Sequence, residues 1–234
     1  MSISVVIPAR NEEGNLKACV QAVVAVVADL FRTYEVIIVD DGSTDGTPAL
    51  ADTLASESPN IQVVHHARGG GFARAYRAGA SRAHGEWVAV IPGDNEIQAV
   101  SLREIFEAVG TSDIVVPVTV NQESRPWVRR TLSRLFTGTV NALFGHRLRY
   151  YQGPAIYRAD VLHTLPSGSS GFVFLTEMLV RALACGHRAV EVPMYVQPRQ
   201  FGTSRAVSLY NVAAALRTLA HLVWDIKIRR RPLG

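Results

Sequence analysis

Short apolar runs recur through the first half of the chain, with polar and helical segments between them. The runs are rich in β-branched residues and are bounded by Gly, Pro, Asp or Asn, which is typical of strands buried on both faces of a sheet. They cover residues 3–7, 36–39, 61–65, 87–91 and 114–120. Regular alternation of strands and helices predicts a parallel, right-handed, doubly wound α/β fold.

The second half begins with a different pattern. Residues 125–149 predict an amphipathic helix whose arginines are offset from an apolar face. The apolar positions are Leu132, Leu135, Phe136, Val140 and Leu143, and the arginines are Arg129, Arg130 and Arg134. The basic face is either a solvated surface or one that contacts an anion or a lipid headgroup.

The remaining elements are a helix, a strand and a last helix. A helix from about Phe174 should end at Gly186, because glycine is favoured just after a helix end. Residues 189–196 predict a strand at the edge of the sheet, since Pro193 has no N–H to donate. The last helix, residues 207–228, is apolar almost all round and ends in basic residues. It could pack on the domain, pair with a second copy, or lie on a bilayer.

Acidic residues follow two of the predicted strands directly. Asp40 and Asp41 come after the second strand, and Asp94 and Glu96 come after the fourth. Ligands of open α/β sheets bind beyond the carboxyl ends of the strands, so these loops should converge on one ligand site. Carboxylates together with a diphosphate are common ligands of Mg²⁺ or Mn²⁺. The alternative is that they are ordinary polar turns.

Two further stretches border the same edge. Asn11 is expected to cap the first helix, with Glu12 in the first turn, where the helix dipole favours an acid. Glu12 could instead line the crevice that Asp41 lines. Three glycines at residues 69–71 would let the backbone approach a phosphate, or they form a flexible turn.

Composition and charge narrow the possible partners. The 234 residues suit one domain, and 48% hydrophobic against 19% charged residues allow a sizeable core. The net charge of +4 is concentrated in residues 125–149 and 229–231, which favours an anionic substrate or a membrane surface. No motif for reading nucleic acid is visible.

The expected location is cytoplasmic, either free or at the cytoplasmic face of a membrane. Cys19 and Cys185 lie far apart in apolar helical contexts, so buried free thiols in a reducing compartment are expected. No signal peptide and no spanning helix are predicted.

The order of the motifs resembles one enzyme family. VVIPARNEE, VIIVDDGSTDGT, GGGFARAYRAG and a strand ending in an acid pair are similar to the inverting GT-A glycosyltransferases of family 2. RPWVRRTLSRLF, GFVFLTEML, AVEVPMYV and RQFGTSR resemble its dolichol- or polyprenyl-phosphate sugar transferase branch. The resemblance covers roughly residues 3–206 and implies a single GT-A, Rossmann-like domain with a mostly parallel central sheet flanked by helices.

That domain would span residues 1–206, with a nucleotide-binding half at 1–120 and an acceptor half at 121–206. Residues 207–234 would form an amphipathic or apolar helix with a basic tail. The partners that the resemblance implies are a GDP- or UDP-sugar donor and a lipid phosphate acceptor. Peripheral membrane contact and a homodimer are further options, and no nucleic-acid partner is expected.

The resemblance also implies roles for individual residues. The donor would contact Pro8, Ala9, Arg10, Glu12, Asp40, Asp41, Gly71 and Asp94. The divalent cation, Mg²⁺ or Mn²⁺, would be held by Asp94 and Glu96. The acceptor and phosphate groups would contact Arg129, Arg130, Arg199, Ser204 and Arg205. The implied catalytic residues are Asp94, Glu177 and Arg199.

Two departures from the family pattern bear on these roles. Pro92 stands where the family has the first acid of its DxD metal motif, which leaves metal binding to Asp94, Glu96 and the diphosphate. This loss keeps open a non-catalytic module that only binds a nucleotide-sugar. Residues 150–154, YYQGP, replace the family's D-x-x-S-G-F segment, which keeps open a transferase acting on a soluble sugar or metabolite hydroxyl.

The expected reaction is a single displacement that inverts the anomeric carbon. A lipid phosphate oxygen is already anionic at neutral pH, so it needs no strong general base, and arginines would position it. A hydroxyl acceptor would need a carboxylate to take its proton. Glu177 is the candidate, although it could equally be a helix acid that pairs with Arg181 one turn later.

Overall fold

The computed structural model describes residues 1–121, 127–166, 168, 169, 171, 173–198 and 209–233, without the side chains of 129 and 209–214. The strands are β1 Ser2–Ala9, β2 Thr33–Asp40, β3 Ile61–His65, β4 Trp87–Val90, β5 Ile114–Thr119, β6 Ile156–Arg158 and β7 Ala189–Met194. The helices are α1 Leu16–Leu30, α2 Thr47–Glu57, α3 Phe72–Ala80, α4 Ala99–Glu107, α5 Trp127–Phe144, α6 Ala159–Thr164, α7 Val173–Ala184, α8 Leu209–Val223 and the π-helix η2 Trp224–Ile228.

All the described strands belong to one sheet, in the order β3-β2-β1-β4-β6-β5-β7. Neighbouring strands are parallel except where β6 pairs with β4 and β5. The predicted α/β fold with a mostly parallel sheet is therefore confirmed. Strand β6 inserts between β4 and β5, so both halves of the chain build the same sheet. The sequence pattern does not show this insertion. Pro193 lies in β7 at the edge, as expected.

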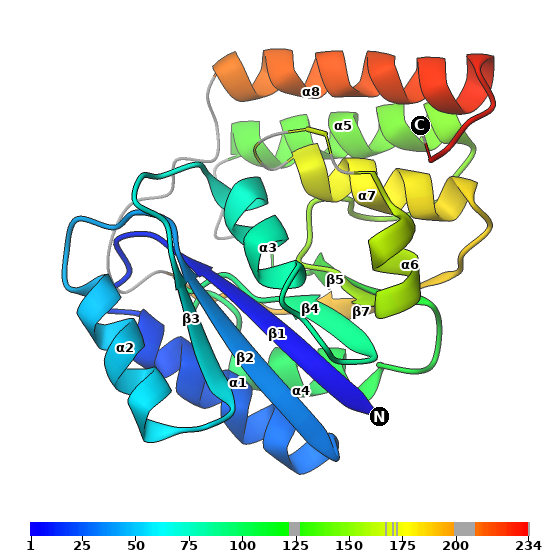
Figure 1. The fold of residues 1–234 in the computed structure, drawn as a ribbon. Coiled ribbons are helices and arrows are strands. Elements are labelled where there is room, and N and C mark those ends of the chain that lie inside the picture. Colours follow the sequence, from blue (N-terminus) through cyan, green and yellow to red (C-terminus); the bar gives the residue numbers. More distant parts are fainter. Residues whose placement is uncertain (122–126, 167, 170, 172, 199–208, 234) are drawn as a thin grey trace.

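Helices cover both faces of the sheet (Figure 1). Alternate residues of β1 point to opposite faces, so that Val5 and Ile7 join one hydrophobic cluster and Val6 joins the other. The first cluster packs against α1, α2 and α4, and the second against α3, α6 and α7. Helices α5 and α8 lie furthest from the sheet on the second side (Figure 1). The sheet and its strand ends are thus fixed from both faces.

The first helix starts later than the sequence predicts. Asn11 has a φ of 56° and does not cap a helix, and α1 begins only at Leu16. Glu12 therefore lies in the loop before the helix rather than in its first turn. Helix α2 begins at Thr47, whose N donates to Asp45 Oδ1 at 3.0 Å.

In the C-terminal half, α5, α7 and β7 occur where the sequence predicts them, and α6 is an additional short helix. Helix α7 ends at Ala184, and Gly186, with a φ of 88°, lies two residues beyond it, as expected for a glycine just after a helix end. On α5, Val140 is buried, whereas Leu132 and Leu135 point outward and are 45% and 63% exposed. The protein therefore covers only part of the apolar face that the sequence predicts for this helix. In the described part of the chain no helix combines the length and the apolar character needed to cross a bilayer.

Candidate functional site

Backbone hydrogen bonds continue past the end of β1 on both sides. Asp41 N donates to Ala9 O at 2.9 Å, and Gly93 N donates to Pro8 O at 3.0 Å. The loops after β1, β2 and β4 therefore meet at one edge of the sheet, as the sequence predicts. The described elements place Pro8, Ala9, Asp40, Asp41 and the loop of Asp94 around this edge.

The loop after β1 is fastened to the loop after β2. Asn11 N donates to Ser43 Oγ at 3.0 Å, and Thr44 N donates to Asn11 Oδ1 at 2.8 Å. Glu12 N donates to Thr47 Oγ1 at 2.8 Å. The backbone of Asn11 is in the left-handed region. Asparagine suits this position, because its short polar side chain tolerates that backbone and hydrogen-bonds locally. The interlock fixes the position of Arg10 and Glu12 relative to the acids of β2.

Asp40 stabilises the turn after β2. Its side chain is 4% exposed, and its Oδ1 accepts a hydrogen bond from Ser43 N at 3.0 Å. Its Oδ2 lies 3.1 Å from His65 Nδ1, and the other ring nitrogen of His65 lies 3.0 Å from Asp52 Oδ1. Hydrogen bonds to Asp52 and then to Asp40 raise the pKa of His65.

Asp41 holds the glycine-rich loop. It accepts hydrogen bonds from Gly70 N at 2.9 Å and from Gly71 N at 2.6 Å, and its Oδ1 lies 2.8 Å from His66 Nδ1. The carboxylate is 3% exposed, so it acts here as a buried anchor between β2 and the start of α3. Sequence reasoning missed His66, although its position directly after β3 at the same sheet edge was a usable signal.

Arginines surround the glycine-rich loop. The Arg10 guanidinium occupies the space that a Cβ on Gly69 would need, and Arg74 packs against Gly70 and donates from Nη1 to Arg68 O at 3.1 Å. A Cβ on Gly42 would lie 2.5 Å from Gly69 N. The loop therefore lies against the turn of β2, and arginine side chains fill the space beside Gly69 and Gly70.

The loop of Asp94 is connected to the end of β7. Asp94 Oδ1 accepts a hydrogen bond from Glu96 N at 3.2 Å. Gln197 N donates to Glu96 O at 2.7 Å, and Gln197 Nε2 donates to Asn95 O at 2.9 Å. These contacts bring the segment after β7 beside the predicted metal loop. Gln197 is a second residue that sequence reasoning missed, because the pairing joins positions 102 residues apart.

Two carboxylates of the site lie close to the buried thiol of Cys19. Burial raises the pKa of Cys19 to about 12, together with the charge of Asp94 and, to a smaller extent, that of Glu12. Asp94 and Glu12 thus share one neighbourhood and concentrate negative charge there. Carboxylate oxygens of this kind suit a hard cation such as Mg²⁺ or Mn²⁺. Among the residues that the structure describes, no group of three or more His, Cys, Asp and Glu side chains could hold a metal ion. A cation at this site would therefore also need oxygen atoms from a bound ligand.

Glu177 lies away from these acids, inside the helical layer. Its Oε1 lies 3.0 Å from Arg181 Nε, and its Oε2 accepts a hydrogen bond from Ser169 N at 3.0 Å. Ser169 O in turn accepts a hydrogen bond from Arg77 Nη1 of α3 at 3.1 Å. The ion pair one turn apart that the sequence predicts is present. The described hydrogen bonds therefore link Glu177 to the donor half through Ser169 and Arg77.

The predicted acceptor residues are only partly described. Arg130 is half-buried on α5. The side chain of Arg129, and all of Arg199, Ser204 and Arg205, lie outside the described residues. The departing segment at residues 150–154 is packed in the interior, where Tyr150 and Tyr151 are 8% and 1% exposed. Its divergence from the family pattern therefore coincides with a role in packing.

The sequence of the chain is similar to that of known proteins over most of its length. The model of the family "Glycosyl transferase family 2" matches residues 4–165. An undecaprenyl-phosphate mannosyltransferase of Micrococcus luteus is 29% identical over 217 residues, which cover 88% of this chain and 87% of that protein. A polyprenol monophosphomannose synthase of Mycolicibacterium smegmatis is 29% identical over 238 residues, which cover 96% of this chain and 87% of that one.

The fold is also found among solved structures. A glucosyl-3-phosphoglycerate synthase of Mycobacterium tuberculosis in complex with Mn²⁺, UDP and phosphoglyceric acid matches with a TM-score of 0.69 and 18% identity. The match covers 95% of this chain and 78% of that one. TarS of S. aureus in complex with UDP-GlcNAc matches with a TM-score of 0.65 and 17% identity, covering 95% and 67% of the two chains.

Proposed function

The chain belongs to glycosyl transferase family 2 and is a nucleotide-sugar-dependent glycosyltransferase; from this premise we propose that it transfers a sugar from a nucleotide diphosphate to a polyprenyl phosphate, with inversion at the anomeric carbon. The observation that carries the proposal is similarity over nearly the whole chain to two proteins named for sugar transfer to undecaprenyl phosphate or polyprenol. This similarity extends beyond residue 165, where the family match ends, and so includes the acceptor half.

The donor is proposed to bind across the carboxyl ends of β1, β2 and β4. Three features support this placement: the interlocked loops, the anchored glycine-rich turn, and the cationic groups of Arg10 and Arg74 beside it. Pro8, Ala9, Arg10, Glu12, Asp40, Asp41, Gly71 and Asp94 are the proposed donor residues. Asp40 and Asp41 would act mainly by holding the loops in place, because both are buried and hydrogen-bonded within the protein.

A divalent cation fits this site only together with the donor. Asp94 and Glu96 lie in one loop and would supply carboxylate oxygens, and the donor's diphosphate would supply the rest. When bound, Mg²⁺ or Mn²⁺ would neutralise the charge that develops on the leaving nucleoside diphosphate. The solved relative with Mn²⁺ and UDP is consistent with this chemistry.

The acceptor phosphate is proposed to bind arginines of the second half. Arg129 and Arg130 at the start of α5, with Arg199, Ser204 and Arg205, are the proposed contacts. A phosphate oxygen attacks as the anion and needs no general base, which agrees with the engagement of Glu177 by Arg181 and Ser169 N. Charge-assisted hydrogen bonds from a guanidinium fix the direction of attack. Acceptor lipids of this kind lie in membranes, so peripheral membrane association belongs to the proposal.

A transfer assay with a short polyprenyl phosphate tests this function. UDP- and GDP-sugars are supplied in turn with Mg²⁺ or Mn²⁺, and labelled sugar is measured in the lipid product. One donor should give product with inverted configuration, and Asp94→Asn should lower kcat by about 100-fold or more, as loss of an electrostatic group at the leaving charge does.

The acceptor contacts are tested with Arg129→Ala/Arg130→Ala. Loss of charged hydrogen bonds should raise KM for polyprenyl phosphate by roughly 10- to 100-fold. The donor KM should stay unchanged, because these arginines belong to the acceptor half. The proposal would be overturned if none of the UDP- and GDP-sugars gave a lipid product. Full activity of Asp94→Asn would overturn it as well.

A further inference from the structure

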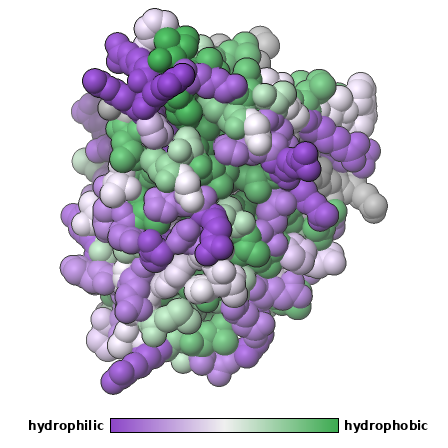
Figure 2. All heavy atoms as spheres, turned by 90° about the vertical axis from the view of Figure 1, so that its right-hand side faces the viewer, coloured by the Kyte–Doolittle hydropathy of each residue, from purple (hydrophilic) through white to green (hydrophobic). Residues whose placement is uncertain are grey.

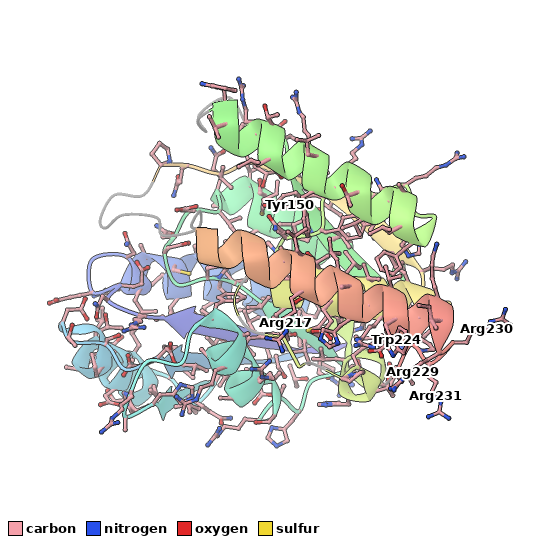
Figure 3. All side chains as sticks on the ribbon, turned by 90° about the horizontal axis from the view of Figure 1, so that it is seen from above. Tyr150, Arg217, Trp224, Arg229, Arg230 and Arg231 are labelled. Carbon is pink, nitrogen blue, oxygen red and sulfur yellow. The ribbon has the colours of Figure 1, made fainter. Side chains whose placement is uncertain are left out.

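Large apolar side chains lie uncovered on the outer helical layer. On α5, Trp127 and Leu135 are 70% and 63% exposed, and on α8 and η2, Leu216, Trp224 and Ile228 are 65%, 49% and 59% exposed. Figure 3 looks down on this layer and shows α5 and α8 side by side, with no other drawn helix or strand over them. Tryptophan, leucine and isoleucine exposed together on one layer indicate an interaction surface.

The exposed residues of α8 form a regular stripe. Leu216, Ala220, Trp224 and Ile228 follow one another at intervals of four residues, and all are exposed. Leu219 and Leu222, at 5% and 0% exposure, form the opposite side and belong to the core. Helix α8 thus has two apolar sides, one packed on the protein and one exposed among the residues that the structure describes.

Positive charge borders the stripe. Arg217, Lys227, Arg229, Arg230 and Arg231 are all exposed. Figure 3 shows Arg229, Arg230 and Arg231 gathered at the end of the helix near Trp224, and the Arg229 guanidinium lies 5.8 Å from the centre of the Trp224 ring. The upper edge of Figure 2 shows strongly hydrophilic side chains next to hydrophobic ones on this end of the molecule.

Negative charge is nearly absent from the same layer. Residues 127–144 contain no Asp or Glu, and residues 209–231 contain only Asp225. Asp225 turns inward, where its Oδ2 lies 2.9 Å from Nη2 of the buried Arg181. Arg181 Nη1 also donates to Pro232 O at 2.8 Å. Arg181 therefore holds Asp225 and Pro232 against the rest of the protein, and the basic residues between them stay at the surface.

We propose that the outer face of α8 and η2, together with the exposed apolar residues of α5, docks the enzyme on a bilayer that contains anionic lipids. An amphipathic face with tryptophan and basic residues binds such a surface through apolar burial and electrostatic attraction. A second copy of the chain fits less well, because it would bring two basic faces together. The inference rests on the proposed function, and it assigns the side of the enzyme that faces the membrane.

Sedimentation with vesicles tests the docking without donor or acceptor. Wild type should bind phosphatidylcholine vesicles that contain phosphatidylglycerol and bind vesicles of phosphatidylcholine alone far more weakly. Arg229→Gln/Arg230→Gln/Arg231→Gln should weaken binding roughly 100-fold, at about fivefold per charge. Trp224→Ser/Ile228→Ser should weaken it about 10-fold or more. Val100→Ser is the matched control, since Val100 is 57% exposed on α4, on the other face of the sheet.

Three results would overturn the inference. They are equal binding to both kinds of vesicle, equal loss in Val100→Ser, and a dimer in light scattering that Trp224→Ser/Ile228→Ser disrupts while vesicle binding persists. The docking variants should still transfer sugar to a short, water-soluble polyprenyl phosphate. Loss of vesicle binding with retained transfer supports docking, whereas absent transfer with normal vesicle binding refutes only the proposed function.

Discussion

Replacing Arg181 with methionine should strongly destabilise the protein, because two carboxylates then lose the cation between them. The Arg181 side chain is 6% exposed, and its guanidinium contacts Glu177 Oε1 at 3.0 Å and Asp225 Oδ2 at 2.9 Å. Glu177 is equally enclosed, with a side chain 7% exposed, whereas Asp225 at 18% keeps more contact with water. The main cost is therefore the unpaired charge of Glu177.

Breaking a buried ion pair from one side costs about 3–5 kcal/mol. For a chain of this size each kcal/mol lowers the unfolding midpoint by about 2–4 °C, so a fall of roughly 6–20 °C is expected. Thermal and urea unfolding followed by circular dichroism measure the loss. The mutant should keep the urea m-value, because the surface exposed on unfolding does not change.

A double variant separates charge from packing. In Arg181→Met/Glu177→Gln the uncompensated carboxylate is gone, so at least half of the lost stability should return. A loss below about 1 kcal/mol in the single variant, or no recovery in the double variant, would refute the reasoning. Glu177→Gln also tests catalysis: if Glu177 were a general base, kcat of the folded enzyme would fall about 10²- to 10⁴-fold. With a lipid phosphate acceptor, kcat should change only a few-fold.

Three further predictions concern residues in or near the candidate site. Gly42→Ala should cost about 1–3 kcal/mol and weaken donor binding, because its φ is +66° and the new Cβ would lie 2.5 Å from Gly69 N; an equal cost in Gly71→Ala, where nothing lies within 4 Å, would argue against the clash, and urea unfolding measures both. The raised pKa of His65 implies stability that is fully present below its ordinary value of 6.5 and lost as pH rises through the folded value, so Asp52→Asn should flatten the dependence of the unfolding midpoint on pH between about 6 and 8. Asp52 is 66% exposed, so the effect should stay below about 1 kcal/mol. Cys19, with its pKa raised to about 12 by burial, should resist a maleimide at pH 8 until the protein unfolds, which mass spectrometry of labelled peptides detects; rapid labelling of the folded protein would contradict its burial.

Local patterns predicted the strands that carry the site but not how the loops lock together. The apolar runs and the acids after β2 and β4 follow from burial and strand-end chemistry, which are local in sequence. The place of β6 between β4 and β5 depends on long-range pairing, which periodicity does not encode. The prediction that Asn11 caps the first helix is wrong for a related reason. Its side chain bonds Thr44 of another loop instead of capping a helix, and such tertiary contacts override local helix preference.

The outer layer shows another limit of periodicity. The sequence predicts an apolar face on α5, and on that face Leu132 and Leu135 point outward while Val140 packs inward. Hydrophobic periodicity shows that a face is apolar, but it does not say what covers that face. What covers such a face depends on tertiary structure, and the exposure and charge of the folded layer are the basis for proposing a bilayer.

The most direct test of the central claim compares two acceptors that differ only at the head: a short polyprenyl phosphate and the polyprenol of the same chain length. Both are offered with the same nucleotide-sugar and divalent cation, and the initial rate of label transfer is measured for each. The proposed reaction predicts product on the phosphate, with inverted configuration, and none detectable on the alcohol, because only the phosphate oxygen attacks without a base. Faster transfer to polyprenol or to a soluble alcohol than to the phosphate would contradict it.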